Sequence, residues 1–437
     1  MDFILAAINE HKSSDLYKTA ADAEMYYNGE NPTINNSNKY IYDANGNPVV
    51  NVWEPNHKIA SSFFGFVVRQ ENGYLLGNGV TFNDSETKDK LGTKNKPFDQ
   101  QVFAVGEKAI IGGRAFGFWN YDHIDDFSIQ EFAPLYDEEN GALMAGIRFW
   151  RMDDTKPLRA TLFEIDGYTD YVLRTGEDMQ ARTPKRAYIT HAISDAAGRN
   201  RGDIIYRGEN YPGLPIFPMK YGKKGVSEIV GKRNTIDAYD LAFSNMINNV
   251  SDGKNTYWVI KNAGGMDAVD DWNFVQRTLK TGVVHGEGDE VPEPHTIEAP
   301  YQSSVSALSE LRNQLNADFM TFNSQELSGG NRTATEIEEA YANLDLKVDA
   351  FEANVTEFIN ALLDFLGIDD APSYTRNKRQ NATEQMQTLM TAAPYLDAEY
   401  ITTKALTIMG DPDMADEVLK RQAAENFDRF GGQQNND

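Results

Sequence analysis

The stretch from Thr335 to Leu366 constrains the fold more than any other, because its apolar residues form one continuous helical seam. They recur at alternating steps of four and three residues: Ile337, Tyr341, Leu344, Val348, Phe351, Val355, Phe358, Leu362 and Phe365. This spacing predicts a single helix roughly 45–50 Å long with one face to bury. Eight carboxylates and a single base, Lys347, share the rest of the stretch, so the opposite face is expected to be solvated and acidic. Such a helix is more typical of a wall or spoke than of a catalytic pocket.

Composition narrows the class of protein. A chain of 437 residues is long enough for about two or three domains. The absence of cysteine excludes a disulfide framework and thiolate catalysis. A net charge of −25 argues against wrapping nucleic acid, although DNA could pass such a surface without adhering. No apolar run is long enough to span a membrane, and the first residues predict an amphipathic helix rather than a signal peptide.

The N-terminal half predicts an α+β body built on antiparallel pairing. Residues 1–30 have a helical pattern that ends near Asn28-Gly29 and Pro32. From residue 39 to about 221 the chain is rich in β-formers, with strands expected at 143–150, 160–165 and 186–193 and turns at Asn45-Gly46 and Asp166-Gly167. Two helices are expected within this part, at residues 56–70 and 97–111.

The C-terminal half is predominantly helical. An apolar helix is expected at 227–252, a compact insertion with a strand at TYWVI at 254–300, and a second helix at 303–322. Adjacent glycines at 329 and 330 interrupt the pattern before the long helix, for which Thr333 is the expected N-cap and Gly367 the expected C-cap. Short helices are expected between residues 381 and 430.

The sequence contains no convincing catalytic, metal or cofactor motif. The segment 225–233 departs from a phosphate-binding loop in spacing and ends on Arg233 instead of Ser or Thr. The six histidines are dispersed. Acidic pairs such as Asp125-Asp126 and Asp270-Asp271 leave a carbohydrate hydrolase as an alternative, but adjacent strand residues point to opposite faces. We therefore expect no catalytic residue, no metal and no cofactor.

Four stretches make the chain resemble the portal proteins of tailed bacteriophages, in particular the family of long-tailed phages with Gram-positive hosts. They are EMYYNGENPTI with the segment 56–80, the segment 112–150, the proline-led segment 214–252, and LSGGNRTATEIEEAYANLDLKVDAFEANV at 327–355. The resemblance covers roughly residues 20–366, and beyond it only position and helical character agree.

The resemblance implies a portal fold of α+β class that assembles as a ring. The implied parts are a β-rich wing (1–226), a first stem helix (227–251), a small α/β clip (252–302), a second stem helix (303–322), a tunnel loop (323–332), a long kinked wing helix (333–367) and a helical crown with a flexible tail (368–437).

The implied function is that of a non-enzymatic portal at one capsid vertex, a ring of twelve subunits that conducts double-stranded DNA during packaging and ejection. The implied partners are the large terminase, the head-tail adaptor, the major capsid protein and the scaffolding protein, with the protein assembled in the host cytoplasm and located in the virion. Another head-completion or tail protein is the structural alternative.

The resemblance also suggests roles for named residues. The DNA-facing tunnel loop would comprise Gln325, Glu326, Leu327, Ser328, Gly329, Gly330 and Asn331, whose glycines would let the loop shift. The clip aromatics Trp258, Trp272 and Phe274 would contact a partner or form the clip's own small core. The stem would pack through Ile236, Tyr239, Phe243, Ile247, Leu308, Leu311, Leu315 and Phe319. Each apolar stripe, the long seam included, could pack within its own subunit or against a neighbour.

Overall fold

The computed structural model describes residues 2–43, 45–52, 54–174, 176, 178–194, 204–251, 256–259, 273, 293–296, 301–322, 334–377, 382–411, 414–415 and 417–421. The chain divides into two compact units. The first comprises Met1–Thr321 and Leu346–Arg376, and the second comprises Phe322–Asp345 and Asn377–Asp437. The long helix α10 (Ala334–Leu366) contributes residues to both units.

The strands of the first unit pair antiparallel throughout its described part, as the turn-rich sequence predicts. A five-stranded sheet has the order β10-β9-β8-β7-β6 and a three-stranded sheet the order β13-β4-β5. Their bounds are β4 (Arg114–Trp119), β5 (Ile124–Ser128), β6 (Phe132–Tyr136), β7 (Leu143–Trp150), β8 (Leu158–Glu164), β9 (Gly167–Leu173), β10 (Gln180–Ala181) and β13 (Ile216–Lys220). The remaining pairs are β1 (Tyr40–Tyr42) with β2 (Pro48–Val50), β3 (Val80–Thr81) with β16 (Ser373–Tyr374), β11 (Ile189–Ser194) with β12 (Ile204–Glu209), and β14 (Thr256–Val259) with β15 (Glu293–Thr296).

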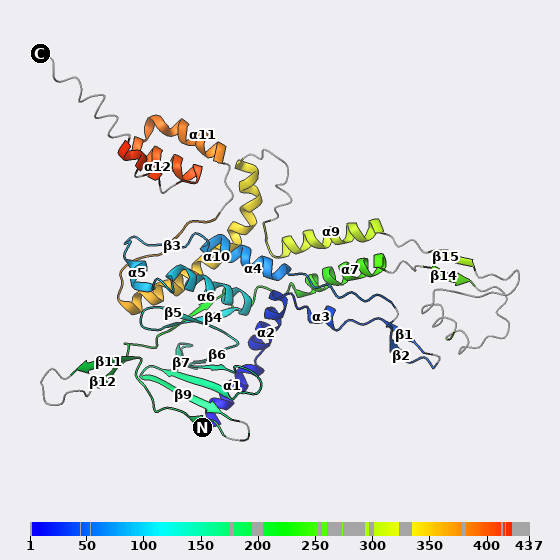
Figure 1. Ribbon diagram of the computed structural model, residues 1–437, viewed down its shortest axis with the longest axis horizontal. Helices are drawn as coiled ribbons and strands as arrows, with labels where there is room; N and C mark the ends of the chain where they lie inside the picture. The colour runs from blue at the N-terminus through cyan, green and yellow to red at the C-terminus, as the bar shows by residue number, and fades with distance from the viewer. Residues whose placement is uncertain are drawn as a thin grey trace, which may run out of the picture. The chain divides into compact units, whose positions relative to one another are not determined.

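Helices cover the three-stranded sheet and the N-terminal edge of the five-stranded one (Figure 1). Helix α6 (Phe98–Gly112) packs on β4 and β5, and α1 (Asp2–Ser13) contacts β6 and β7. Helices α2 (Asp15–Tyr27), α4 (Phe63–Leu76) and α5 (Thr87–Leu91) pack on α6, and the short α3 (Pro32–Asn35) follows α2. The N-terminal helical pattern is thus confirmed, with a break at Ser14, whose hydroxyl accepts the Tyr17 amide at 3.2 Å. Aromatic rings fill the space behind β4, where Phe116 and Phe132 lie 4.5 Å apart between ring centroids. This core supports the helices that carry the site.

The predicted seam is buried from Tyr341 to Leu362 and partly buried at Phe365, and from Val348 onward it packs within its own chain. Val348, Phe351, Val355, Phe358 and Leu362 are each at most 1% exposed. Their neighbours include glycines that leave no room for a side chain: a Cβ added at Gly117 would lie 2.7 Å from the Phe358 ring. The helix ends at Gly367, which has a φ of +66°. The Ile368 amide donates to the Leu363 carbonyl at 3.0 Å, so the predicted glycine cap is formed. Between the two alternatives left open for this stripe, the structure supports intrachain packing.

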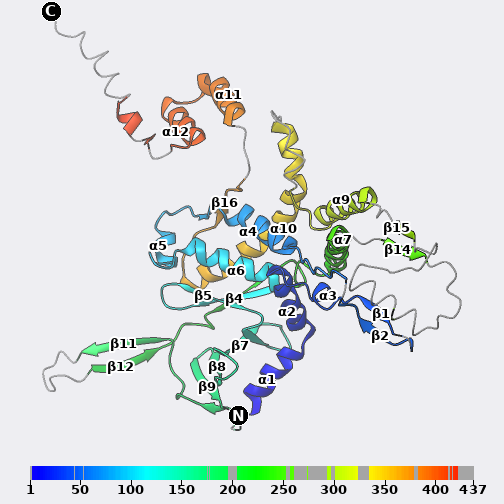
Figure 2. The ribbon, with the colours of Figure 1, turned by 45° about the vertical axis from the view of Figure 1, so that its right-hand side comes forward.

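The second unit is helical where the structure describes it (Figure 2). It contains α11 (Ala382–Ala392), the 3-10 turn η1 (Ala393–Tyr395) and α12 (Ala398–Met409). Asp397 caps α12 by accepting the Tyr400 amide at 2.7 Å, and Gly410 ends it with a φ of +92°. On its part of α10, Tyr341 stacks on Phe322 with ring centroids 4.2 Å apart. The short C-terminal helices that the sequence predicts are therefore present up to residue 421.

Candidate functional site

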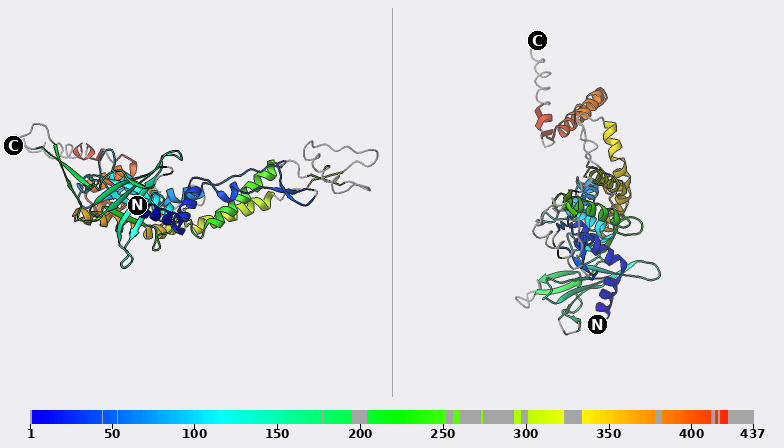
Figure 3. Two further views of the ribbon diagram at one scale, coloured as in Figure 1. Left: turned by 90° about the horizontal axis from the view of Figure 1, so that it is seen from below. Right: turned by 90° about the vertical axis from the view of Figure 1, so that its right-hand side faces the viewer.

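Two helices project side by side from the body of the first unit (Figure 1 and Figure 3, left). They are α7 (Arg233–Ser251) and α9 (Tyr301–Asp318), the two helices predicted to form a stem. We refer to this pair as the stem. The first of them begins at Arg233, six residues later than the start of its apolar pattern, because residues 228–232 form turns.

The predicted stem-packing residues fall into two groups. Ile236, Leu308, Leu315 and Phe319 are buried, whereas Tyr239, Phe243, Ile247 and Leu311 are partly buried. Thr235 at the base of α7 donates a hydrogen bond to Asp318 at the end of α9 (3.0 Å). Phe319 anchors this base on α4, with its ring 5.6 Å from that of Phe63. The stem is thus well packed at its base, while farther out Leu241, Val250 and Tyr301 are 42%, 64% and 60% exposed in a single chain.

A row of polar side chains on α7 binds an extended backbone segment, residues 57–61, along the length of the helix. Asn248 Oδ1 accepts the His57 amide at 2.6 Å, Ser244 Oγ accepts the Ile59 amide at 3.0 Å, and Asp240 Oδ1 accepts the Ser61 amide at 3.0 Å. We refer to these three bonds as the amide ladder. The registers match because four helical residues rise about 6 Å, close to the length of two extended residues, about 6.6 Å.

The amide ladder explains two departures from the sequence prediction. The predicted helix at 56–70 begins only at Phe63, because residues 57–61 must stay extended to reach α7. The buried positions on the distal part of α7 are polar: Asp240, Ser244 and Asn248 are at most 4% exposed. Burial raises the pKa of Asp240 and nearby Asp237 adds to the effect, against hydrogen bonds from Ser61 and Asn31. The polar pattern at i, i+4 and i+8, formed by Asp240, Ser244 and Asn248, was the sequence signal that could have revealed the amide ladder.

The single base of the acidic long helix lies at a buried ionic junction. Lys347 Nζ lies 2.7 Å from Glu71 Oε2 and 3.1 Å from Glu228 Oε1, and it donates to the Phe319 carbonyl at 3.1 Å. The Tyr221 hydroxyl lies within 2.9 Å of a carboxylate oxygen on each glutamate. We refer to this group as the Lys347 junction. It joins α4, the turns before α7, the end of α9 and the part of α10 in the first unit.

The electrostatics of the Lys347 junction depend on the lysine. Burial alone lowers the pKa of Lys347, but its two carboxylate partners outweigh that effect and raise it. Burial raises the pKa of Glu71, and Lys347 opposes it only in part. For Glu228, burial is outweighed by Lys347 and Lys232, so its pKa is lowered. Lys232 Nζ lies 2.5 Å from Glu228, so the two acids are balanced by two bases.

A second anchor holds the C-terminal end of α10. Asp370 accepts the amides of Asn83 (3.0 Å) and Asp84 (3.1 Å) and the hydroxyl of Thr87 (2.7 Å). These hydrogen bonds, that from Thr87 above all, lower the pKa of Asp370 to about 2. Arg376 bonds both Asp349 and Glu352 on α10, at 2.5 and 2.7 Å. The long helix is therefore fixed within the first unit from Lys347 to its end.

Some predicted site residues cannot be placed. Gln325, Glu326, Leu327, Ser328, Gly329, Gly330 and Asn331 lie outside the described residues, as do the expected N-cap Thr333 and the clip residues Trp272 and Phe274. Trp258 lies on β14, opposite Pro294 of β15. The predicted TYWVI strand is therefore present, and its partner strand was not foreseen.

The described residues contain no arrangement that points to catalysis. Asp125 and Asp126, one of the pairs considered for a hydrolase, bind Lys96 (2.8 Å) and Lys108 (2.7 Å). No group of His, Asp or Glu within the described ranges could hold a metal ion. Among the helices described, none is long and apolar enough to cross a membrane.

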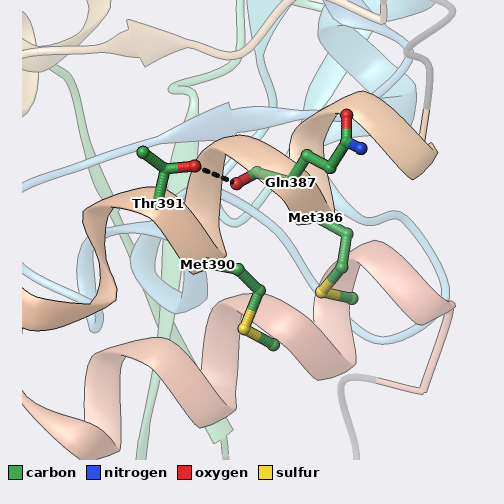
Figure 4. A pocket seen from close by; sticks show the side chains of 4 residues that line it. All are labelled: Met386, Gln387, Met390 and Thr391. Carbon is green, nitrogen blue, oxygen red and sulfur yellow. Dashed lines mark hydrogen bonds between the residues drawn. The ribbon is translucent and has the colours of Figure 1, made fainter.

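The second unit has a shallow pocket on α11 (Figure 4). Met386 and Met390 project from α11 toward α12, and Thr391 donates a hydrogen bond to the Gln387 carbonyl at 2.8 Å. The four lining residues include no titratable side chain, so this pocket offers no acid-base chemistry.

Comparison with known proteins identifies the class to which this chain belongs: it is a phage portal protein. More narrowly, it belongs to the family described as phage portal protein, SPP1 Gp6-like, whose model matches residues 7–427. A curated relative, the portal protein of Bacillus phage SPP1, is 25% identical over 417 residues, covering 88% of this chain and 78% of the relative. The family is one of structural virion proteins, and the resemblance seen in the sequence is confirmed.

Two solved structures share a more distant likeness. A chain from the neck of a native GTA particle, computed with C12 symmetry, matches with a TM-score of 0.39 and 9% identity, covering 85% of this chain and 96% of that one. A chain from the neck of an empty GTA particle, computed with C6 symmetry, matches with a TM-score of 0.36 and 11% identity, covering 80% and 90%. At these TM-scores neither structure constrains the fold of this chain.

Proposed function

We propose that this portal protein assembles as a closed ring of twelve copies at one capsid vertex and conducts double-stranded DNA during packaging and ejection. The observation that carries the proposal is the family match over residues 7–427. A ring requires a heterologous interface, in which one patch meets a different patch on the next copy. The exposed apolar side chains of the stem, Leu241, Val250 and Tyr301, are one source of such patches.

The negative net charge favours a protein that lets DNA pass over one that wraps DNA. Each copy carries a net charge of −25, and duplex phosphates repel acidic side chains, so DNA would slide along the bore with little adhesion. The tunnel loop, residues 323–332, would be the moving part that follows the duplex. The Lys347 junction supports this role, because it fixes both the end of α9 and the body of α10, between which the loop is connected.

The finer partner assignments follow from the same proposal. The clip, with Trp258, Trp272 and Phe274, would bind the large terminase during packaging and the head-tail adaptor afterwards. The wing and crown would meet the major capsid and scaffolding proteins. Assembly would take place in the host cytoplasm, before the ring becomes part of the virion.

Light scattering on the purified chain tests the ring. Twelve copies of 49.0 kDa give a particle of about 590 kDa, and negative-stain images should show an axial hole. A species of 49.0 kDa that persists at high protein concentration would contradict the proposal.

A deletion separates the loop from the ring. Removing Ser328 to Asn331 should leave the ring mass unchanged and reduce DNA packaging in a terminase-driven assay. A second variant replaces the loop glycines 329 and 330 by serine, which keeps the length and so separates the effect of loop length from that of the glycines' conformational freedom. Undiminished packaging by the deleted chain would remove the proposed role of the loop.

A further inference from the structure

The hairpin formed by β1 and β2 exposes apolar side chains on both of its faces. The pairing of Tyr40 with Val50 and of Tyr42 with Pro48 puts these four residues on one face. Tyr40, Tyr42 and Val50 are 56%, 67% and 44% exposed, and Val49 on the other face is 44% exposed. A two-stranded hairpin with no packed face is marginally stable in water, so this exposure points to an absent partner.

The hairpin is held in a fixed place beside the stem. At its base the Asn51 amide donates to the Lys39 carbonyl at 2.8 Å, and the side chain of Asn56 donates to the Ser37 carbonyl at 3.3 Å. The chain then enters the amide ladder at His57, 2.6 Å from Asn248 on α7. In Figure 1 and in the left view of Figure 3 the hairpin lies near the distal end of α7 and farther from the body than that end. It is therefore a positioned surface.

The side of α7 away from the amide ladder carries a matching exposed stripe. Ala238, Leu241, Asn245 and Asn249 are exposed, and at about 100° per residue they lie roughly 100–180° around the helix axis from Asp240. Leu241, the largest apolar residue of this stripe, is 42% exposed. The segment 57–61 that follows the hairpin and this stripe thus lie on different sides of α7, an arrangement that a head-to-tail ring contact can use.

Charge favours another copy of the chain as the occupant. Residues 241–251 and 301–309, the distal stem, contain no Asp, Glu, Lys or Arg, although 24% of the chain is charged. The single charge of the hairpin, Asp43, binds its own turn, accepting the amides of Asn45 (2.9 Å) and Asn47 (2.8 Å). Copies with a net charge of −25 repel each other, so their contacts are best made where both surfaces are uncharged. Tyrosine is also among the residues enriched in protein interfaces.

We propose that the hairpin face formed by Tyr40, Tyr42, Pro48 and Val50 docks on the exposed α7 stripe of the next copy in the ring. This inference rests on the proposed ring and adds to it the pair of patches that closes it. Each copy gives its hairpin to one neighbour and receives a hairpin from the other.

The absence of cysteine allows a direct test. One chain carries Val50→Cys, a second chain of different tagged mass carries Leu241→Cys, and the two are co-assembled and treated with a short bis-maleimide. A mixed dimer that requires both cysteines is expected. The matched control replaces Val50→Cys by Met152→Cys, at a position 79% exposed between β7 and β8, and should give at most a tenth of that product.

The outcomes separate this inference from the proposed function. Rings of full mass without the mixed dimer would overturn the hairpin contact and leave the ring standing, whereas a monomer that never assembles would contradict the proposed function itself. As a second readout, the double variant Tyr40→Ser/Tyr42→Ser should keep the far-ultraviolet circular dichroism of the parent and raise the concentration needed for ring formation at least tenfold. An unchanged assembly concentration would also refute the contact.

Discussion

Replacing Lys347 by methionine is the sharpest test of the Lys347 junction. The substitution keeps an unbranched side chain, one atom shorter, and removes the charge, which leaves Glu71 (0% exposed side chain) and Glu228 (9% exposed) without their central partner. Removing one member of a buried ion pair typically costs about 3–5 kcal/mol. Because Lys347 is itself only 7% exposed, solvent screening does not reduce this figure. We expect a loss of about that size in the free energy of unfolding at neutral pH.

The pH dependence of the loss follows from the glutamate. In the variant the pKa of Glu71, which burial already raises, no longer has Lys347 to oppose it. The folded variant then holds a proton that the unfolded chain has released above its ordinary pKa of 4.5. Between pH 4.5 and the raised pKa of Glu71, the free energy of unfolding of the variant falls as the pH rises. The deficit relative to the parent should therefore be largest at neutral pH and shrink as the pH approaches 4.5.

Urea unfolding at one fixed protein concentration, repeated from pH 4.5 to 8, measures both effects. The matched control is Lys223→Met, which removes an exposed lysine and should change stability by less than about 0.5 kcal/mol. The double variant Lys347→Met/Glu71→Gln should recover part of the loss, because one unpaired charge is gone. A Lys347→Met loss below about 1 kcal/mol, or a deficit that does not vary with pH, would refute the reasoning.

Three further predictions concern the stem, the sheet and the second anchor. Ser244→Ala leaves the Ile59 amide without its acceptor and should lower the free energy of unfolding by about 1–3 kcal/mol. Hydrogen exchange at Ile59 should become faster, whereas the control Asn245→Ala, at an exposed position, should leave that exchange unchanged. Gly146→Ala would put a Cβ 1.9 Å from the Phe132 ring and should cost at least about 1–3 kcal/mol by overpacking in thermal unfolding. The matched control Gly73→Ala, where an added Cβ meets open space, should cost less. The pKa of Asp370 is lowered from 3.8 to about 2, so its carboxylate stabilises the fold above pH 3.8 and loses that contribution as the pH falls toward 2. Asp370→Asn should therefore flatten the acid-unfolding curve between pH 3.8 and 2.

Periodic segments were the part of the fold that sequence predicted well. Strand β7 spans Leu143–Trp150 as expected, α6 spans Phe98–Gly112 against an expected 97–111, and α10 spans Ala334–Leu366. These elements have a strong apolar period and clear end signals, such as Gly367 after α10. Their local pattern and their tertiary packing agree, so one predicts the other.

The polar features escaped sequence analysis because each depends on residues far apart in the chain. Lys347 was expected to stand on a solvated acidic face, yet it pairs with Glu71 and Glu228, more than a hundred positions away. The residues of the amide ladder bind a backbone segment about 180 to 190 positions earlier. Spacing within a helix reveals which side chains share a face, but it does not reveal what that face meets.

The most direct test of a portal built on this stem is an electron cryo-microscopy map of the purified, assembled chain. We expect a closed annulus in which the stem of every copy stands around an axial channel wide enough for duplex DNA. A compact single chain at high concentration, or an annulus whose channel is too narrow for the duplex, would contradict the account.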